Sequence, residues 1–390
     1  MNIVFFHSNG ILPTLGGISR ITDTLGVLFA DKGNNVWYIG MQDKHKGSKY
    51  RPWQSFLPSS DLFSDVNVKY IREFVRKHKV DAIINQCALD PRSAEFLSIC
   101  KIETEFLLIS CFHNSILTPV FNGAYQKEYN LKKRGLGVLF YLMKTRVVAS
   151  LITRAYIIKH RKRYISTVIN SDKVILLCDG QLPELYRMCG IKTSDKVCVI
   201  PNCIDVNVEQ PKSKEKIVLW VGTFDYSIKR PDNMLRIWKQ VEAKHPDWNL
   251  YMLGDGPSWR EMKTLSNSLG LKQVKFEGRV NPEDYYKKAS IICITSVHES
   301  FSLVTVEAQR VGCVPILNNC FSPAPLLVQD GVNGCLVPAF NNNAFAHRLI
   351  SIMEDYEKRM KMSSNAISSV NRFSLDAVYE HWMNLLNNRI

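Results

Sequence analysis

The chain has 390 residues and a formal net charge of +14, with 46% hydrophobic and 22% charged residues. This length accommodates two ordinary α/β domains, and the composition excludes a disordered or fibrous chain. Eleven cysteines without a C-x-x-C pair argue against a disulfide framework or a zinc site, and they favour reduced, buried thiols in the cytosol. No apolar run reaches the roughly 18 residues that a membrane-spanning helix needs.

Apolar runs alternate with stretches of helical periodicity through the first half of the chain. The run at 2–7 predicts a first strand rather than a signal peptide, because no basic segment precedes it. The elements expected next are a helix at 18–32, a strand at 35–40, a helix at 68–78, and strands at 80–85, 106–112 and 173–178. This alternation predicts a parallel sheet covered by helices.

A polar segment at 206–216 is the expected linker to a second α/β series. That series comprises strands at 217–221, 249–253, 274–277, 291–295 and 314–317, and helices at 232–244, 258–269, 282–289 and 302–311. We expect two doubly wound domains, 1–205 and 206–370, with a ligand cleft at the carboxyl ends of their strands. A last helix within 371–390 is expected to pack back on the N-terminal domain.

Residues 131–170 contain ten Lys and Arg residues and no acidic residue, interleaved with apolar side chains. The net positive charge implies an anionic partner, which could be nucleic acid, a membrane surface or a phosphorylated small molecule. A basic amphipathic stretch favours an anionic membrane surface, and we find no nucleic-acid-binding motif. The alternative is a core-packed helix with solvated charges. The apolar residues expected along one side of the helix are Leu136, Leu139, Phe140, Met143, Val147 and Leu151.

The segment 296–315 follows an expected strand and opens an expected helix. Ser300 or Ser302 can cap that helix, and the free backbone N–H groups at such a start bind anions. Glu299 precedes the helix and Glu307 lies on it. Ionised carboxylates accept hydrogen bonds, so the pair suits sugar and ribose hydroxyls. Taken alone, the pair could equally be two ordinary surface glutamates.

This segment reads S-x-x-E-S-F-S-L-V-x-x-E-A-x-x-x-G-x-V-P, and it resembles the signature of the retaining family-four glycosyltransferases of the GT-B fold. Further matches follow in order: Gly16-Gly17, the P-N-C-I-D of 201–205, Val221-Gly222 with Lys229, the G-D-G-P of 254–257, the F-E-G of 276–278, and the D-G-V-N-G-C-L-V of 330–337. The resemblance is strong from 222 to 337 and sparse between 46 and 173. It implies two Rossmann-like domains facing across a cleft.

The resemblance implies a role for each matching position. Glu307 would bind the ribose hydroxyls, Glu299 would contact the transferred sugar, and Lys229 would neutralise the leaving diphosphate. Gly17 would allow close backbone approach to the donor, and His113 would be an active-site histidine. The implied catalytic residues are His113, Lys229 and Glu299. The implied donor-binding residues are Gly16, Gly17, Gly222, Thr223, Arg230, Gly254, Gly278, Arg279, Phe301, Ser302, Leu303, Val304 and Glu307.

Two positions depart from the family pattern. Thr223 stands where the family usually has arginine, so one diphosphate contact is missing or supplied elsewhere. Arg230, which directly follows Lys229, is a candidate for that contact. However, the side chains of adjacent residues on an extended loop point apart, so Lys229 and Arg230 are not expected to point the same way. Cys203 replaces a glycine, which is a milder departure.

The resemblance implies metal-independent transfer of a hexosyl group from a UDP- or GDP-sugar to a glycan or lipid-linked acceptor, in lipopolysaccharide or capsule synthesis at the cytoplasmic face of a membrane. The sequence contains no G-x-G-x-x-G, Walker A or Asp-x-Asp motif and no metal-ligand spacing, so we expect no cofactor and no metal. The alternatives are a nucleotide-sugar epimerase of the same fold and a non-catalytic partner subunit. The sequence leaves the sugar, the base and the acceptor open.

Overall fold

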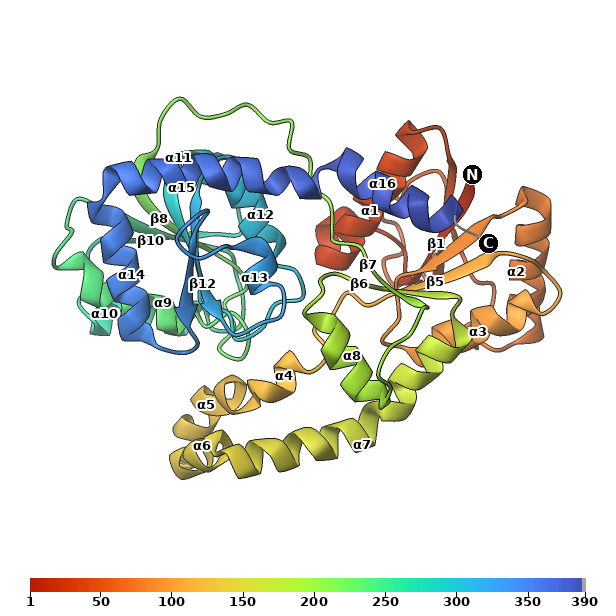
Figure 1. Ribbon diagram of the computed structural model, residues 1–390, viewed down its shortest axis with the longest axis horizontal. Helices are drawn as coiled ribbons and strands as arrows, with labels where there is room; N and C mark the ends of the chain where they lie inside the picture. Colours follow the sequence, from red (N-terminus) through yellow and green to blue (C-terminus); the bar gives the residue numbers. More distant parts are fainter. Residues whose placement is uncertain (388–390) are drawn as a thin grey trace. The chain divides into compact units, whose positions relative to one another are not determined.

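The computed structural model describes residues 1–387 and divides the chain into two compact units (Figure 1). The first unit comprises Met1–Ile116, Tyr156–Cys203 and the chain from Phe373 onward. The second comprises Leu117–Ala155 and Ile204–Arg372. Domain boundaries were expected after residues 205 and 370, and the units divide after Cys203 and Arg372. Residues 117–155, expected in the N-terminal domain, belong to the second unit.

The first unit is built on a seven-stranded parallel sheet with the order β3-β2-β1-β4-β5-β6-β7. Its strands are β1 (Asn2–Asn9), β2 (Asn35–Gln42), β3 (Gln54–Phe56), β4 (Ala82–Asn85), β5 (Leu107–Cys111), β6 (Lys173–Leu176) and β7 (Val197–Val199). Successive side chains of a strand point to opposite faces. Ile3 and Phe5 therefore pack in one core cluster, and Val4 and Phe6 pack in another on the opposite face.

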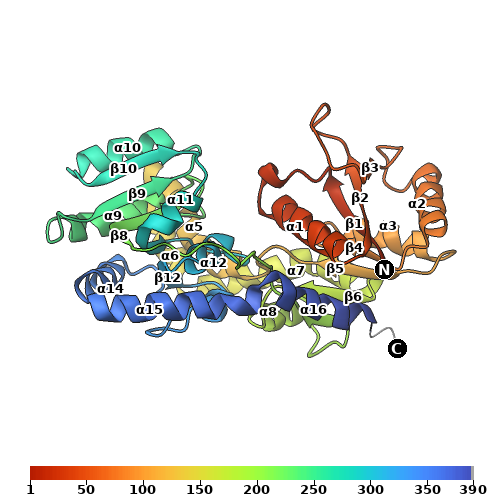
Figure 2. The same cartoon turned by 90° about the horizontal axis from the view of Figure 1, so that it is seen from above.

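Helices cover both faces of this sheet (Figure 2). They are α1 (Gly17–Asp31), α2 (Asp65–His78), α3 (Pro91–Lys101), α8 (Gln181–Cys189), α16 (Leu375–Asn387) and the later part of α7 (Arg146–Asn170), with a short 3-10 turn η1 (Pro13–Leu15). Helices α1 and α16 share one core cluster, where Phe29 contacts Trp382 edge-on. Helices α2 and α3 line the other cluster.

The second unit has a six-stranded parallel sheet with the order β10-β9-β8-β11-β12-β13. Its strands are β8 (Glu215–Val221), β9 (Asn249–Leu253), β10 (Val274–Gly278), β11 (Ala289–Ile294), β12 (Val314–Asn319) and β13 (Cys335–Pro338). In each sheet the earliest strand lies in the interior and later strands add on both sides of it, which is the doubly wound arrangement. The predicted fold of two Rossmann-like domains is therefore confirmed.

The helices that alternate with these strands, and those that follow the last strand, surround this sheet. They are α9 (Pro231–Glu242), α10 (Trp259–Ser268), α11 (Glu283–Lys288), α12 (Leu303–Gln309), α13 (Ala324–Leu327), α14 (Asn342–Glu354) and α15 (Tyr356–Ser369), followed by the 3-10 turn η2 (Val370–Phe373). Side chains of α9, α10 and α14 share one core cluster with the strands, including Trp238, Met262 and Phe345. This core fixes the strand ends from which the candidate site is built.

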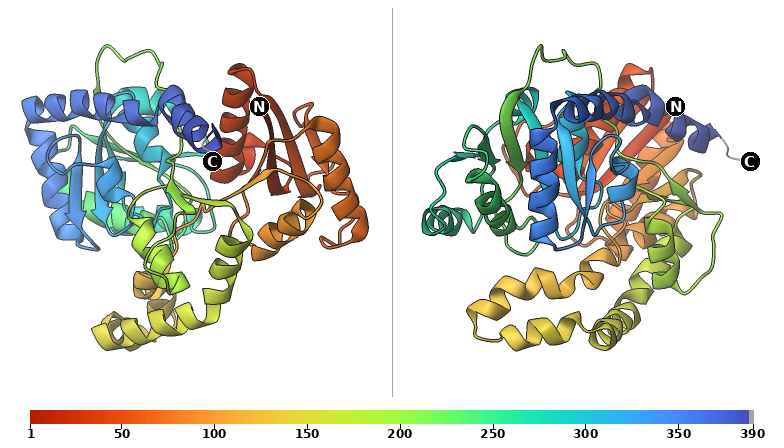
Figure 3. Two further views of the ribbon diagram at one scale, coloured as in Figure 1. Left: turned by 45° about the vertical axis from the view of Figure 1, so that its right-hand side comes forward. Right: turned by 60° about the vertical axis from the view of Figure 1, so that its left-hand side comes forward.

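The basic stretch 131–170 is not one amphipathic helix. After α4 (Thr118–Phe121), it begins in the last turn of α5 (Gly123–Lys133). It then forms α6 (Gly137–Lys144) and α7, with a break at Thr145, whose backbone is extended (Figure 3, yellow). Phe140 is 4% exposed and contacts Tyr125 edge-on, so its predicted place on an exposed apolar face is wrong. Within residues 1–387, no helix is long and apolar enough to cross a membrane.

Candidate functional site

Four loops of the second unit meet at one edge of its sheet, because the carboxyl ends of parallel strands lie together. The loops after β8 and β9 are joined by a hydrogen bond of 3.0 Å from Gly222 N to Leu253 O, and Gly254 N donates to Gly278 O at 2.7 Å. The loop after β11 is tied to the loop after β8 by a 2.7 Å bond from Val297 N to Ile228 O. The sequence motifs after these four strands therefore share one neighbourhood.

Lys229 and Glu299 form an ion pair at this edge. Lys229 Nζ lies 2.6 Å from Glu299 Oε1, with side-chain exposures of 25% and 11%. Ser296 Oγ donates to the same carboxylate oxygen at 2.6 Å. The Lys229 carbonyl accepts a 2.9 Å hydrogen bond from Thr295 Oγ1, which fixes the backbone beneath the amine. The site thus presents a cation paired with an acceptor carboxylate, and the carboxylate is also held by Ser296.

The glycines of these loops serve close backbone packing. Gly254 has φ +127°, and a Cβ built there would overlap the Gly222 carbonyl oxygen and lie 2.9 Å from its carbon. Gly278 has φ +75°, but a Cβ there would have no neighbour within 4 Å. Glycine is therefore required at position 254 by the packing of the loops alone. A contact between Gly254 and the donor stays a prediction.

The start of α12 differs from the expected cap. Ser302 is the residue before the helix, with φ +65°, and it makes no side-chain cap hydrogen bond. Its Oγ lies 2.8 Å from Thr305 Oγ1 instead. The predicted cap by Ser302 is wrong, because the left-handed backbone directs its hydroxyl to another side chain. Phe301 is 2% exposed, so its predicted donor contact would require the surrounding loop to open, while Leu303 and Val304 are partly buried.

Glu307 lies on α12, where its Oε2 accepts a 3.1 Å hydrogen bond from Tyr286 Oη. Tyr286 comes from α11 and is 1% exposed, so it is a fixed partner. Tyr286 could not be predicted from the sequence, because nothing in its local pattern distinguishes it from a core tyrosine. Its hydroxyl orients one oxygen of Glu307.

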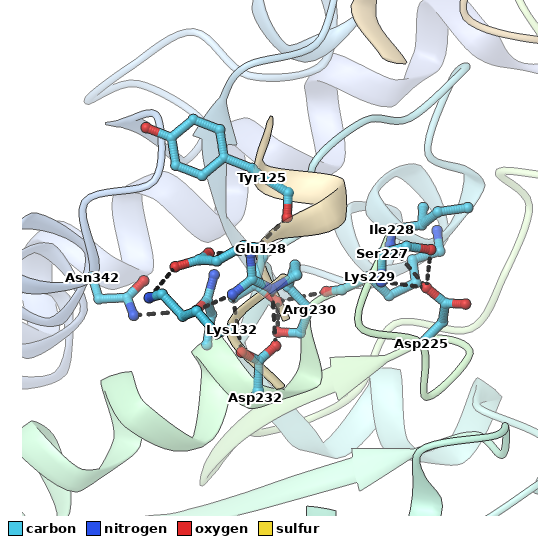
Figure 4. Close-up of polar contacts among 12 residues, drawn as sticks. Tyr125, Glu128, Lys132, Asp225, Ser227, Ile228, Lys229, Arg230, Asp232 and Asn342 are labelled. Carbon is cyan, nitrogen blue, oxygen red and sulfur yellow. Dashed lines mark hydrogen bonds and ion pairs between the residues drawn. The ribbon is translucent and has the colours of Figure 1, made fainter. Parts of the chain in front are cut away.

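Arg230 does not face an open donor site. Its side chain is 5% exposed and donates to Asp232 through Nε and Nη2, both at 3.0 Å, and to Glu128 through Nη1 at 2.9 Å (Figure 4). Nη2 also donates to Asn233 at 3.1 Å, and Nη1 to the Tyr125 carbonyl at 3.3 Å. This geometry argues against the predicted diphosphate contact of Arg230, since every guanidinium nitrogen already has a protein acceptor.

Two further donor-binding candidates, Thr223 and Arg279, are exposed. The Thr223 carbonyl accepts a 2.8 Å hydrogen bond from Asp225 N, and Arg279 directly follows Gly278 at the end of β10. His298 lies beside Glu299, Lys229 and Asp225, and burial is the main cause of its lowered pKa. His298 was not among the residues predicted from the sequence, although it is adjacent to Glu299.

The candidates of the first unit also lie at strand ends. His113 follows β5, and its Nε2 contacts Gln86 Oε1 from the end of β4. Burial, aided by His7 at the end of β1, lowers the pKa of His113 to about 4, so the ring is neutral at pH 7. Gly16 has φ +119° and precedes α1, and a Cβ on Gly17 would meet no atom within 4 Å. Gln86 and His7 belong to no sequence motif, so they could not be predicted as neighbours of His113.

The second unit matches a known family model. Residues 204–369 match the family described as glycosyl transferases group 1. An uncharacterized glycosyltransferase from Haemophilus influenzae is 28% identical over 222 residues, which cover 56% of this chain and 62% of that protein. This alignment therefore spans less than two thirds of that relative.

Other similarities extend over the whole chain. The amylovoran biosynthesis glycosyltransferase AmsD of Erwinia amylovora is 22% identical, with 95% of this chain and 96% of that protein covered. The solved structure of HepE from Anabaena in complex with UDP has a TM-score of 0.75 and 17% identity, over 99% of this chain and 100% of that one. At this identity, the structural similarity shows the shared GT-B fold.

Proposed function

We propose that this chain, whose residues 204–369 belong to the group 1 glycosyl transferases, moves a hexosyl group from a UDP- or GDP-sugar to a glycan or lipid-linked acceptor with retention of configuration. The observation that carries the proposal is the Lys229–Glu299 ion pair at the strand-end edge of the second unit. The pair places a fixed cation and a fixed acceptor group beside each other, at the edge where doubly wound sheets bind ligands.

These two groups suit the chemistry of glycosyl transfer. The bond between the anomeric carbon and the diphosphate oxygen breaks, and its electrons remain on the diphosphate. The acceptor oxygen bonds to the anomeric carbon, and its proton passes to an oxygen of the leaving diphosphate. Lys229 stabilises the charge that develops on the leaving diphosphate, and a preorganised cation is effective because it needs no reorganisation during the reaction. Glu299 accepts hydrogen bonds from hydroxyls of the transferred sugar.

The named relatives support the finer parts of the proposal. The HepE structure contains UDP, which favours a uridine diphosphate donor. AmsD is described as acting in amylovoran biosynthesis, which favours a role in making a cell-surface polysaccharide such as capsule or lipopolysaccharide. The epimerase alternative gains no support, because the two sequence relatives named above are described as glycosyltransferases.

A panel of nucleotide sugars tests the proposal. The protein is incubated with UDP-, GDP-, ADP- and CMP-sugars and a mixture of lipid-linked and soluble glycan acceptors. We expect release of one nucleotide and an acceptor heavier by one sugar residue. An epimerase would convert the donor without releasing nucleotide, and a non-catalytic subunit would leave both substrates unchanged.

We also propose that the transfer needs no metal ion. The sequence contains no Asp-x-Asp motif, and residues 1–387 contain no group of three His, Cys, Asp or Glu side chains placed to hold a metal. Lys229 supplies the positive charge that a divalent cation would otherwise provide at the diphosphate. Turnover is therefore expected to persist in excess EDTA. Loss of activity that magnesium or manganese restores would refute this part of the proposal.

An exposed apolar and basic surface on α6 and the start of α7 suggests where the acceptor membrane binds. Its apolar members are Leu136, Val138, Leu139, Tyr141, Leu142, Val147 and Leu151, which are 44–71% exposed. Exposed basic residues of the same segment include Arg134, Lys144, Arg146 and Arg154. We propose that this surface docks on the anionic cytoplasmic leaflet of a membrane, because buried apolar side chains and basic residues both favour such binding.

Liposome sedimentation tests the membrane proposal. Binding is expected to rise with anionic lipid and to fall with salt, because salt screens the attraction. Replacing Arg134, Arg146 and Arg154 together with glutamine is expected to weaken binding to anionic vesicles roughly tenfold or more. Replacing Val138 and Leu142 together with serine should reduce the part of vesicle binding that does not respond to salt. Ile102→Ser, at an exposed residue of the first unit, is the control. Equal recovery with neutral and anionic vesicles would exclude this role.

A further inference from the structure

The loop that carries Lys229 is attached to a helix far away in the sequence. Arg230 has φ +53°, a left-handed conformation that costs free energy for a residue with a Cβ, and its guanidinium bridges Asp232 and Glu128. Glu128 lies on α5, and burial opposes its charge, but Lys132 and Arg230 together lower its pKa. The buried Arg230 guanidinium is therefore paired with two carboxylates. These ion pairs restrict where the Lys229 loop can lie (Figure 4).

The loop that carries Glu299 is attached to the same helical segment. Asn122, which is 8% exposed and directly precedes α5, donates from Nδ2 to the carbonyls of Val297 at 2.6 Å and Cys320 at 2.8 Å. Val297 is two residues before Glu299. The two ends of the Lys229–Glu299 ion pair are thus both connected, through one or two residues, to 122–128.

Two pairs of aromatic rings also connect α5 to loops of the second unit. Tyr129 stacks on Tyr226 with ring centroids 3.4 Å apart, and Tyr125 stacks on Phe340 at 3.5 Å. Tyr226 belongs to the Lys229 loop, so α5 contacts that loop through both an ion pair and a ring. The ring pairs therefore place α5 in direct contact with the loops that carry Tyr226 and Phe340.

We propose that Glu128 and Asn122 are positioning residues, which set the distance between Lys229 Nζ and Glu299 through Arg230 and the Val297 carbonyl. The helical segment that interrupts the first domain in sequence thereby shapes the site of the second. The expected effect on turnover rests on the proposed function, whereas the effect on the distance between Lys229 Nζ and Glu299 does not.

Competitive labelling of lysines with trace acetic anhydride tests the effect on this distance without any substrate. The Lys229 amine donates to Glu299, so it is expected to react more slowly than the amine of Lys69, whose side chain is 77% exposed. Glu128→Gln, Glu128→Ala and Asn122→Ala are each expected to raise Lys229 labelling relative to Lys69 by about threefold or more, because part of a charge-assisted hydrogen bond is lost. Mass spectrometry reads the labelling at each lysine.

Asp247→Asn is the control. Asp247 pairs with Lys216 at 2.6 Å near the start of β8, at the opposite edge of the sheet from the Lys229 loop. This variant should leave Lys229 labelling unchanged. Unchanged labelling in a Glu128 variant and in Asn122→Ala, with the melting temperature retained, would overturn the proposal. Three variants are included so that one poorly folded protein does not decide the result.

Turnover gives the second readout. With the donor found in the nucleotide-sugar panel, Glu128→Gln is expected to lower kcat more than it raises the KM for the donor. In a Lys229→Ala background, Glu128→Gln should have little further effect on kcat, since residues acting as one unit are not additive. Full additivity would show a merely structural role. If labelling responds but no donor is turned over, the positional inference stands and the proposed function fails.

Discussion

Replacing Lys229 with alanine lowers kcat by a factor of roughly ten to a thousand, the effect expected for the loss of one preorganised electrostatic contact. The cation is 25% exposed and paired with Glu299 at 2.6 Å, so it is fixed before the donor arrives. The loss should fall mainly on kcat, because the charge on the diphosphate develops as the glycosidic bond breaks. Steady-state kinetics with the identified donor measures the effect.

A control for Lys229→Ala lies on β8, the strand that precedes the Lys229 loop. Lys216 pairs with Asp247 at 2.6 Å near the start of β8, at the opposite edge of the sheet from the site. Lys216→Ala removes an ion pair of the same length and should leave kcat unchanged. Equal losses in the two variants would mean that Lys229 acts through stability. Melting temperatures of both variants separate these cases.

Replacing Gly254 with alanine destabilises the second unit by on the order of 3 kcal/mol or more, since it combines an unfavourable φ with a clash against backbone. The Cβ would overlap the Gly222 carbonyl oxygen, and hydrogen bonds to Leu253 O and Gly278 O hold that pair of loops in place. Gly278→Ala is the matched control, because φ is +75° there but no atom lies within 4 Å of the Cβ. Chemical denaturation measures both. Equal stability losses would refute the clash.

Local patterns were sufficient to predict most of the second sheet. The run at 249–253 forms β9 within the predicted bounds, and the helix expected at 232–244 is observed as Pro231–Glu242. These elements alternate clearly between apolar strands and periodic helices, and Gly254 or Pro231 marks their ends. Helices α3 and α8 were missed. The apolar residues of α3 show little helical period, whereas α8 is amphipathic but only nine residues long.

The arrangement around Arg230 could not be predicted from the sequence. Neighbours on a loop were expected to point apart, and Lys229 and Arg230 do so. The partner Glu128, however, is 102 residues away in the chain, and only the tertiary structure brings it to the guanidinium. The same holds for Asn122 and the Val297 carbonyl. Motif spacing predicts which residues share a strand end, whereas partners from an inserted helix carry no such signal.

The most direct test of the account is the melting temperature of the protein with UDP, GDP, ADP and CMP. A ligand that binds only the native state raises stability by RT ln(1 + [L]/Kd), which is about 2.7 kcal/mol at one hundred times Kd. We predict that UDP or GDP raises the melting temperature of the wild type. We also predict that Glu307→Ala loses most of this shift, because we expect the carboxylate that accepts a hydrogen bond from Tyr286 to bind the ribose. No shift with any of the four nucleotides at millimolar concentration would contradict the account.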